Sequence, residues 1–270
     1  MKKLKTVLTI AGSDSSAGAG IQADLKTMLA NGVYGMSVIT ALTAQNTTGV
    51  SDIYEIPADF VKKQINCIFN DIVPDAVKIG MVSSREVIEA ICDQFSFYHP
   101  KNVVIDPVMV STSGTRLLTE SAYEGLGQLF SYALLLTPNI PEAQLLAEYA
   151  IAGKKDMETA AKMISTKYHC AVLLKGGHDV VNADDVLYTG QRFEWICGER
   201  IDNKNTHGTG CTLSSAVAAY LAKGFDLLKA VRYAKQYLEG AIRSGLDLGM
   251  GTGPLDHGYY MNQIKERNRL

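Results

Sequence analysis

Long hydrophobic runs and a strong charge of either sign are both missing from this sequence. No apolar stretch approaches the roughly 18 residues typical of a membrane-spanning helix, so we expect no membrane span. Lysine plus arginine total 26 and aspartate plus glutamate total 28, which gives a net charge of −2. A chain this close to neutral carries no electrostatic footprint for nucleic acid or for an anionic membrane surface.

Cysteine is scarce, and its spacing is uninformative for pairing. The five cysteines are widely separated and include no C-x-x-C pair, which disfavours a disulfide framework and a structural zinc site. The apolar segment at 6–11 is too short for the hydrophobic region of a signal peptide. We therefore expect a protein of the reducing cytoplasm.

The rest of the composition fits a folded α/β domain. The 270 residues are 47% hydrophobic, and β-rich apolar segments alternate with segments of helical periodicity. This alternation predicts a mainly parallel sheet with helices on both faces, and segments 187–188 and 193–196 predict a small antiparallel hairpin. With no linker or repeat, we expect one domain over 1–270. The expected strands are 7–10, 37–43, 76–79, 103–106, 134–136 and 171–174, and two long helices at 212–223 and 227–244 close the chain.

A glycine-rich segment at 12–20 joins the first expected strand to the first expected helix. It is not a P-loop, because no lysine follows its last glycine, and Ala23 stands where a dinucleotide fingerprint would have its third glycine. Two interpretations stay open. The segment is a flexible turn, or it is a backbone pocket that closes on a small ligand, with Asp24 one helical turn farther on.

A second glycine-rich segment, Thr-His-Gly-Thr-Gly-Cys-Thr at 206–212, directly precedes the apolar stripe of an expected helix. Gly208, Thr209 and Gly210 therefore lie at a helix N-terminus, where free N–H groups and the helix dipole favour an anion such as phosphate. Cys211 is the available nucleophile or base, and this position is expected to lower its thiol pKa. The alternative is an ordinary helix start with a buried cysteine.

Three shorter motifs also follow expected strands. Asn139 and Glu142 are oxygen ligands suited to a hydrated Mg²⁺, although Glu142 equally suits the start of a helix after a proline. Asp106 ends the strand at 103–106, and Lys175, which opens Lys-Gly-Gly-His at 175–178, can neutralise phosphate charge. Because ligands of open α/β sheets bind beyond the carboxyl ends of the strands, these motifs are expected to share one edge.

Six ordered motifs resemble the hydroxymethylpyrimidine/phosphomethylpyrimidine kinases of thiamine biosynthesis, which have the ribokinase-like fold. The resemblance covers nearly the whole chain, from about residue 7 to 257. It is carried by the segments 12–27 (GSDSSAGAGIQADLKT), 40–47 (TALTAQNT), 106–110 (DPVMV), 137–142 (TPNIPE), 175–178 (KGGH) and 206–216 (THGTGCTLSSA).

The resemblance implies ATP-dependent phosphorylation of the hydroxymethyl group of an aminopyrimidine, followed by phosphorylation of the monophosphate. It also implies that Gly12, Asp24 and Gln45 hold the pyrimidine, while Met81 walls the pocket or packs in the core. A Gln carboxamide suits this role because it accepts from an exocyclic amine and donates to a ring nitrogen, as it does on adenine.

The same resemblance assigns the phosphate chemistry. Cys211 is expected to accept the hydroxyl proton while the N–H groups of the preceding three residues bind the transferring phosphate. Mg²⁺ and ATP are the implied cofactors, and the family suggests a homodimer. The implied ligands are Asn139, Glu142 and Asp106 for the metal, and Asn139 and Lys175 for the nucleotide phosphates.

One segment departs from the family pattern, and competing functions remain. Residues 111–116 read Ser-Thr-Ser-Gly-Thr-Arg where Ala-Lys is expected, which leaves Arg116 as a possible substitute for the basic contact.

The closest rival is a pyridoxal or pyridoxine kinase, with dual activity an option, and Gln45 argues for the aminopyrimidine. A nicotinamide-dependent oxidoreductase is disfavoured by the missing dinucleotide fingerprint. A non-catalytic nucleotide sensor is the third alternative.

Overall fold

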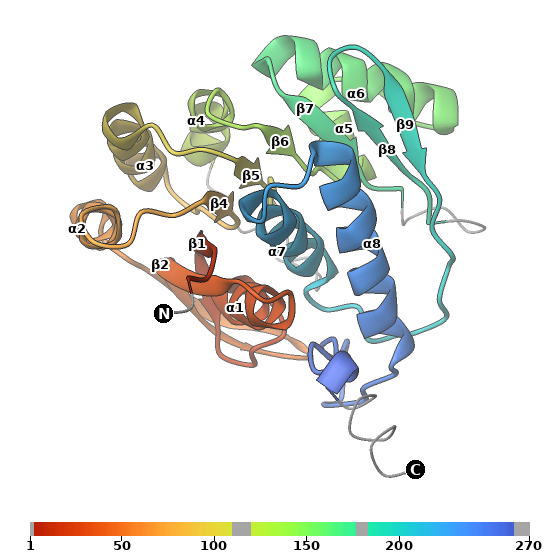
Figure 1. Cartoon of the computed structure of the whole chain (residues 1–270), viewed down its shortest axis with the longest axis horizontal. Coiled ribbons are helices and arrows are strands. Elements are labelled where there is room, and N and C mark those ends of the chain that lie inside the picture. The colour runs from red at the N-terminus through yellow and green to blue at the C-terminus, as the bar shows by residue number, and fades with distance from the viewer. Residues whose placement is uncertain (1–2, 110–119, 177–182, 262–270) are drawn as a thin grey trace.

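The computed structural model describes residues 3–109, 120–176 and 183–261. Its elements follow one another as strands and helices in the expected alternation (Figure 1). In chain order they are β1 (Thr6–Asp14), α1 (Gly20–Ala30), β2 (Tyr34–Asn46), β3 (Gly49–Glu55), α2 (Ala58–Phe69), β4 (Ala76–Ile79), α3 (Arg85–Tyr98), β5 (Val103–Ile105), α4 (Glu120–Phe130), β6 (Leu135–Leu136), α5 (Ile140–Ala147), α6 (Lys154–Tyr168), β7 (Ala171–Leu174), β8 (Asp185–Tyr188), β9 (Phe193–Ile196), α7 (Thr209–Ala222) and α8 (Leu227–Arg243).

Within the described residues the strands form one sheet in the order β3-β2-β1-β4-β5-β6-β7-β8-β9. Strands β2, β1, β4, β5, β6 and β7 pair in parallel, whereas β3 at one edge and β8 and β9 at the other are antiparallel. The parallel sheet and the β8–β9 hairpin were both predicted.

Helices cover both faces of this sheet, as predicted from the continuous apolar strands. Successive residues of one strand point to opposite faces. Leu8 and Val77 accordingly pack in the cluster that includes α2, α3, α4 and α6, whereas Val7 and Ala76 pack against α7 and α8. Figure 1 shows α1, α7 and α8 together on the near face.

Two elements, β3 and α2, were not predicted. β3 is an edge strand of intermediate to high exposure, so it lacks the buried apolar run that marks the inner strands. In α2 the buried residues Val61, Ile65 and Phe69 recur at four-residue spacing, which is a helical signal that the sequence carries. The strand expected at 37–43 extends to Tyr34–Asn46, and the helix expected at 212 begins at Thr209.

The active-site candidate

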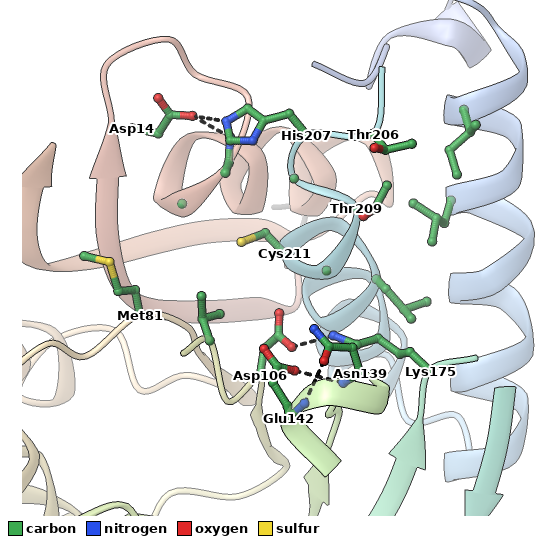
Figure 2. Close-up of a pocket in the computed structure, with 18 of the residues that line it drawn as sticks. Asp14, Met81, Asp106, Asn139, Glu142, Lys175, Thr206, His207, Thr209 and Cys211 are labelled. Atoms are coloured by element: carbon green, nitrogen blue, oxygen red, sulfur yellow. Dashed lines mark hydrogen bonds and ion pairs between the residues drawn. The ribbon is translucent and has the colours of Figure 1, made fainter. Parts of the chain in front are cut away.

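A cavity of about 860 Å³ lies at the carboxyl ends of the parallel strands. Ligand pockets typically occupy about 300–1,000 Å³. The cavity brings together every motif that was expected at this edge. Of the expected site residues it is lined by Gly12, Gln45, Met81, Asp106, Asn139, Glu142, Lys175, Gly208, Thr209, Gly210 and Cys211. In the view of Figure 2, Cys211 lies between an Asp14–His207 pair and an Asp106–Lys175 pair.

The segment after β1 folds around the carboxylate of Asp14. This carboxylate accepts hydrogen bonds from the backbone N–H groups of Ser16, Gly18 and Ala19 and from the Ser16 hydroxyl. His207 Nε2 lies 2.9 Å from Asp14 Oδ2. Burial raises the pKa of Asp14, but the bonds from His207, Ser16 and Ala19 outweigh it and lower the pKa to about 2. The segment is therefore a closed turn held by an ionised side chain.

Glycines permit the two glycine-rich segments to touch. A Cβ on Gly18 would lie 2.2 Å from the His207 ring, and a Cβ on Gly208 would lie 1.9 Å from the carbonyl oxygen of Gly18. Gly208 also has a φ of +84°, which favours glycine. Both glycines are thus required by close packing between residues far apart in the chain.

The pocket end expected to hold the pyrimidine is formed by Gln45, Met81 and Gly12. The backbone of Gln45 is held by Ser15, whose hydroxyl donates to the Gln45 carbonyl and accepts from its N–H. The β2–β3 register shifts between Ala44 and Gln45, an irregularity of the kind that re-aims a side chain. A Cβ on Gly12 would lie 2.7 Å from Met81 Cε, so Met81 packs on Gly12 at the cavity wall.

Helix α7 points its N-terminus into the cavity. Its N-cap residue, Gly208, offers no side-chain cap, so no side chain from that position competes for the first-turn N–H groups. The Thr209 N–H is directed to the Thr206 carbonyl at 3.3 Å. The backbone of Gly208 and Gly210 therefore carries most of the expected anion-binding capacity.

The Cys211 thiol is less acidic than the sequence predicted. Burial raises its pKa to about 11, with the negative charges of Asp24 and Asp106 adding to the rise. Lys78 and a hydrogen bond from the Gly20 N–H lower it only in part. The prediction that the helix N-terminus depresses this pKa was wrong, because removal of the thiolate from water outweighs the dipole.

Asp106 and Lys175 form a buried ion pair at the opposite end of the cavity. Lys175 Nζ donates to Asp106 Oδ1 at 2.8 Å, and the Thr137 hydroxyl donates to the same oxygen. A Cβ on Gly210 would lie 3.0 Å from Asp106 Oδ2 and 3.4 Å from Lys175 Nζ. The N-terminus of α7 thus lies directly against the pair.

Glu142 and Asn139 form a capping box at the start of α5. The Asn139 side chain accepts from the Glu142 N–H, and Glu142 Oε2 accepts from the Asn139 N–H. The helix-start alternative for Glu142 is therefore confirmed. Burial raises the Glu142 pKa to about 7, with Lys175 lowering it and Asp106 raising it. Glu142 lies close enough to this pair for its charge state to depend on both.

Asp24 does not line the cavity, which corrects its expected contact with the pyrimidine. Its side chain is fully buried and receives Lys78 Nζ at 2.9 Å and 3.0 Å. The hydroxyls of Thr9 and Ser215 also donate to it. Asp24, one turn into α1, thus binds a buried lysine. The sequence motif alone does not show whether this residue lies on the helix face toward the cavity or on the face toward the core.

One end of the cavity was missed from the sequence. It extends along α8, where Leu238 and Ile242 lie near Leu213 of α7, and includes Arg200. Lys235 of α8 is paired there with Asp185 at 2.7 Å. The sequence analysis expected a long helix at 227–244 but did not connect it with a ligand site.

Some expectations fall outside the described residues. Gly177 and His178 of the Lys-Gly-Gly-His motif and the departing segment 111–116 with Arg116 lie there. In the described ranges, no helix is long and apolar enough to cross a membrane. The same ranges contain no cluster of three or more His, Cys, Asp or Glu side chains that fits a metal ion.

Comparison with known proteins gives consistent matches over nearly the whole chain. A family model described as phosphomethylpyrimidine kinase matches residues 14–256. The hydroxymethylpyrimidine/phosphomethylpyrimidine kinase of Streptomyces coelicolor is 46% identical over 258 residues, which cover 95% of this chain and 96% of that protein. The thiamine biosynthesis bifunctional protein ThiED of Geobacter sulfurreducens is 47% identical over 264 residues, 97% of this chain and 54% of that protein. The chain thus spans about half the length of this second relative.

A solved structure agrees with the fold. The ADP complex of Bacillus subtilis pyridoxal kinase has a TM-score of 0.89 and 38% identity, and the match covers 96% of this chain and 99% of that chain.

Proposed function

The chain belongs to the phosphomethylpyrimidine kinase family, and from this premise we propose that it transfers the γ-phosphoryl group of ATP to 4-amino-5-hydroxymethyl-2-methylpyrimidine and then phosphorylates the monophosphate. The observation that carries this proposal is the placement of Cys211, at the uncapped N-terminus of α7, between His207, which contacts Gln45, and the Asp106–Lys175 pair (Figure 2). In this arrangement the alcohol would bind beside Gln45, the transferring phosphate at the N-terminus of α7, and the nucleotide phosphates beside the Asp106–Lys175 pair.

In the proposed reaction the substrate hydroxyl oxygen bonds to the γ-phosphorus and the bond to the bridging oxygen of ADP breaks. The hydroxyl proton passes to Sγ of the thiolate form of Cys211, while the backbone N–H groups of Gly208 and Gly210 stabilise the phosphoryl oxygens. Phosphoryl transfer has a loose transition state, so positioning and charge neutralisation by Lys175 supply most of the rate. A weakly ionised base is then sufficient.

The donor set fits a magnesium ion that keeps most of its water. Mg²⁺ typically uses one or two carboxylates together with substrate phosphates, and Asp106 and Glu142 are two carboxylates whose mutual repulsion contributes to the raised Glu142 pKa. Bound there with Asn139, the ion would neutralise charge on the phosphates. The apolar end beside Leu238 and Ile242 is the proposed site of the nucleotide base.

Cys211→Ala tests the base assignment. We expect kcat/KM, measured by ADP release, to fall about 100-fold or more, which is typical for loss of a general base. Since the Cys211 pKa is about 11, wild-type kcat/KM should rise with pH above neutrality, and the variant should lose this rise. The matched control is Cys67→Ala, an exposed cysteine of α2 outside the cavity. Wild-type turnover in a correctly folded Cys211→Ala protein would overturn the role.

The second candidate activity is phosphorylation of pyridoxal or pyridoxine, alone or beside the first. It is favoured by the likeness to the Bacillus subtilis pyridoxal kinase over nearly the whole chain. ADP release measured with each alcohol separates the two activities, and a higher kcat/KM for pyridoxal would reverse our ranking.

We further propose a homodimer of the cytoplasm. Leu42 and Tyr54, a cross-strand pair at the β2–β3 edge, are both exposed, and such apolar exposure suits contact with a second copy. Light scattering at increasing protein concentration distinguishes the dimer from a monomer.

A further inference from the structure

The carboxamide of Gln45 is contacted at both of its ends. The Nε2 position lies 3.2 Å from His207 Nε2, and the Oε1 position lies 3.0 Å from Thr43 Oγ1. The two ends of a carboxamide have nearly the same shape, so hydrogen-bond partners decide which end is oxygen and which is nitrogen. The His207 contact assigns the two ends of Gln45, and the Thr43 contact fits that assignment.

His207 Nε2 must be a hydrogen-bond donor. It lies 2.9 Å from Asp14 Oδ2, and the pKa of Asp14 is lowered to about 2, so this oxygen is a pure acceptor at neutral pH. A neutral imidazole that donates from Nε2 has no lone pair there. The single Nε2 hydrogen has Asp14 Oδ2 at 2.9 Å and the end of Gln45 at 3.2 Å, so it is shared between them. A carboxamide oxygen at this end attracts the shared hydrogen, whereas an N–H₂ group would point its hydrogens at an N–H, so this end of Gln45 is the oxygen.

Thr43 accommodates the same orientation. Its hydroxyl lies 3.0 Å from the Ser13 carbonyl, which can only accept, so the hydroxyl hydrogen has a partner there. The Thr43 oxygen then offers its lone pairs to the N–H₂ group of Gln45. With the Gln45 oxygen toward His207, both ends of the carboxamide have a partner.

We propose that Asp14 and His207 act as positioning residues that fix the hydrogen-bond polarity of Gln45, with its oxygen toward His207 and its nitrogen toward Thr43. The His207 Nε2–H is shared between Asp14 and the Gln45 oxygen, Gln45 donates to Thr43, and Thr43 donates to the Ser13 carbonyl. Gln45 then faces the cavity with one unused lone pair on the His207 side and one unused N–H on the Thr43 side.

This polarity makes the pocket selective for one order of ligand groups, an inference that rests on the proposed function. The ligand has to present a donor on the His207 side and an acceptor on the Thr43 side, as the exocyclic amine and ring nitrogen of an aminopyrimidine do. The corresponding oxo compound presents an acceptor and a ring N–H in the reverse order. A rotated carboxamide would accept it, but a fixed one rejects it.

The polarity is tested in the wild-type protein by NMR, without any turnover. With ¹⁵N-labelled histidine and glutamine, we expect His207 Nε2 to carry hydrogen and the Gln45 amide hydrogens to show cross-relaxation with the Thr43 methyl group. A His207 ring protonated only at Nδ1, or Gln45 amide hydrogens close to the His207 ring instead, would overturn the proposal. These outcomes do not depend on which alcohol is phosphorylated.

The selectivity is tested with His207→Phe, which keeps a ring but removes the donor. We expect its KM for the aminopyrimidine to rise about tenfold, the effect of one lost hydrogen bond, with a smaller change in kcat. Its preference for the amino compound over the oxo compound should fall. His207→Gln restores a donor and should recover the preference.

The matched control is His257→Phe, which alters another buried histidine that does not line the cavity. We expect it to leave the preference unchanged. An unchanged preference in a folded His207→Phe protein would overturn the proposal. If His207→Phe does not fold, the NMR measurement decides. Absence of wild-type turnover with either pyrimidine would count against the proposed function and leave the NMR result standing.

Discussion

Two buried lysine–aspartate pairs lie near Cys211 and differ in what surrounds them. Lys78 and Asp24 are 0% exposed, and both Asp24 oxygens have Lys78 together with a hydroxyl from Thr9 or Ser215 as partners. Lys175 and Asp106 are 16% and 3% exposed and line the cavity. One pair is therefore closed and saturated, whereas the other opens toward the ligand.

The difference shows that a buried charge becomes functional through its access to the cavity and not through its burial. Both lysines have pKa values raised by nearby carboxylates although burial lowers them, so both stay charged. Lys78 acts on the site only through its field, which lowers the Cys211 pKa. Lys175 lines the cavity, where we propose that it contacts a phosphate. Substitutions that remove one charge at a time should separate stability from catalysis.

The largest effect is expected for Lys78→Met. Removing one partner of a buried ion pair leaves the other charge uncompensated, which costs about 3–5 kcal/mol. We therefore expect the free energy of unfolding, measured by urea denaturation, to fall by this amount. The double variant with Asp24→Asn should recover part of the loss because it removes the stranded charge. An unchanged denaturation midpoint in the single variant would show that the pair is not closed.

Lys175→Met should have the opposite profile. Its partner reaches the cavity, so we expect a stability loss well below that of Lys78→Met. Since we propose that the lysine neutralises phosphate charge, kcat/KM from ADP release should fall about 100-fold. Lys175→Arg, which keeps the charge with a different shape, should recover part of the activity. A Lys175→Met protein with full activity would contradict the assignment of this pair to the phosphate end.

The same contrast explains which parts of the site could be predicted from the sequence. Asp106, Lys175 and the α7 N-terminus follow parallel strands or open a helix, and topology places such segments at one edge whatever their side chains do. Asp24 lies inside a helix, where one turn decides between cavity and core, so its motif predicted a contact that the packing does not allow.

Acidity and long-range packing could not be predicted in this way. The raised pKa of Cys211 depends on how much water the fold excludes and on Asp24 and Asp106, which are distant in sequence. The apolar face of α8 gave no sign that its end lines a cavity. The expected parallel sheet, by contrast, was confirmed. It was predicted from the alternation of apolar strand segments with segments of helical periodicity, and these are local patterns that can be read in the sequence.

The smallest and most specific effect is expected for Glu142→Gln at the open pair. Glutamine keeps the capping interaction of α5 but removes the charge. The folded-state Glu142 pKa is about 7 against an ordinary 4.5. Below about pH 4.5 Glu142 is protonated in both the folded and the unfolded protein. Between about pH 4.5 and 7 it ionises only in the unfolded protein, so a rise in pH over this range lowers the free energy of unfolding. Above about pH 7 Glu142 is ionised in both forms, and the loss of stability that it causes no longer changes with pH.

We expect Glu142→Gln to raise Tm relative to wild type at about pH 8 by about 2–4 °C, and to change it little at about pH 4. Added Mg²⁺ should narrow the gap at the higher pH, because a cation offsets the repulsion between Glu142 and Asp106 in the wild type alone. Thermal unfolding of both proteins at the two pH values, with and without Mg²⁺, measures this. A Tm difference independent of pH would mean that the Glu142 pKa is the same in the folded and the unfolded protein, and the open pair would then tolerate a second carboxylate without a metal.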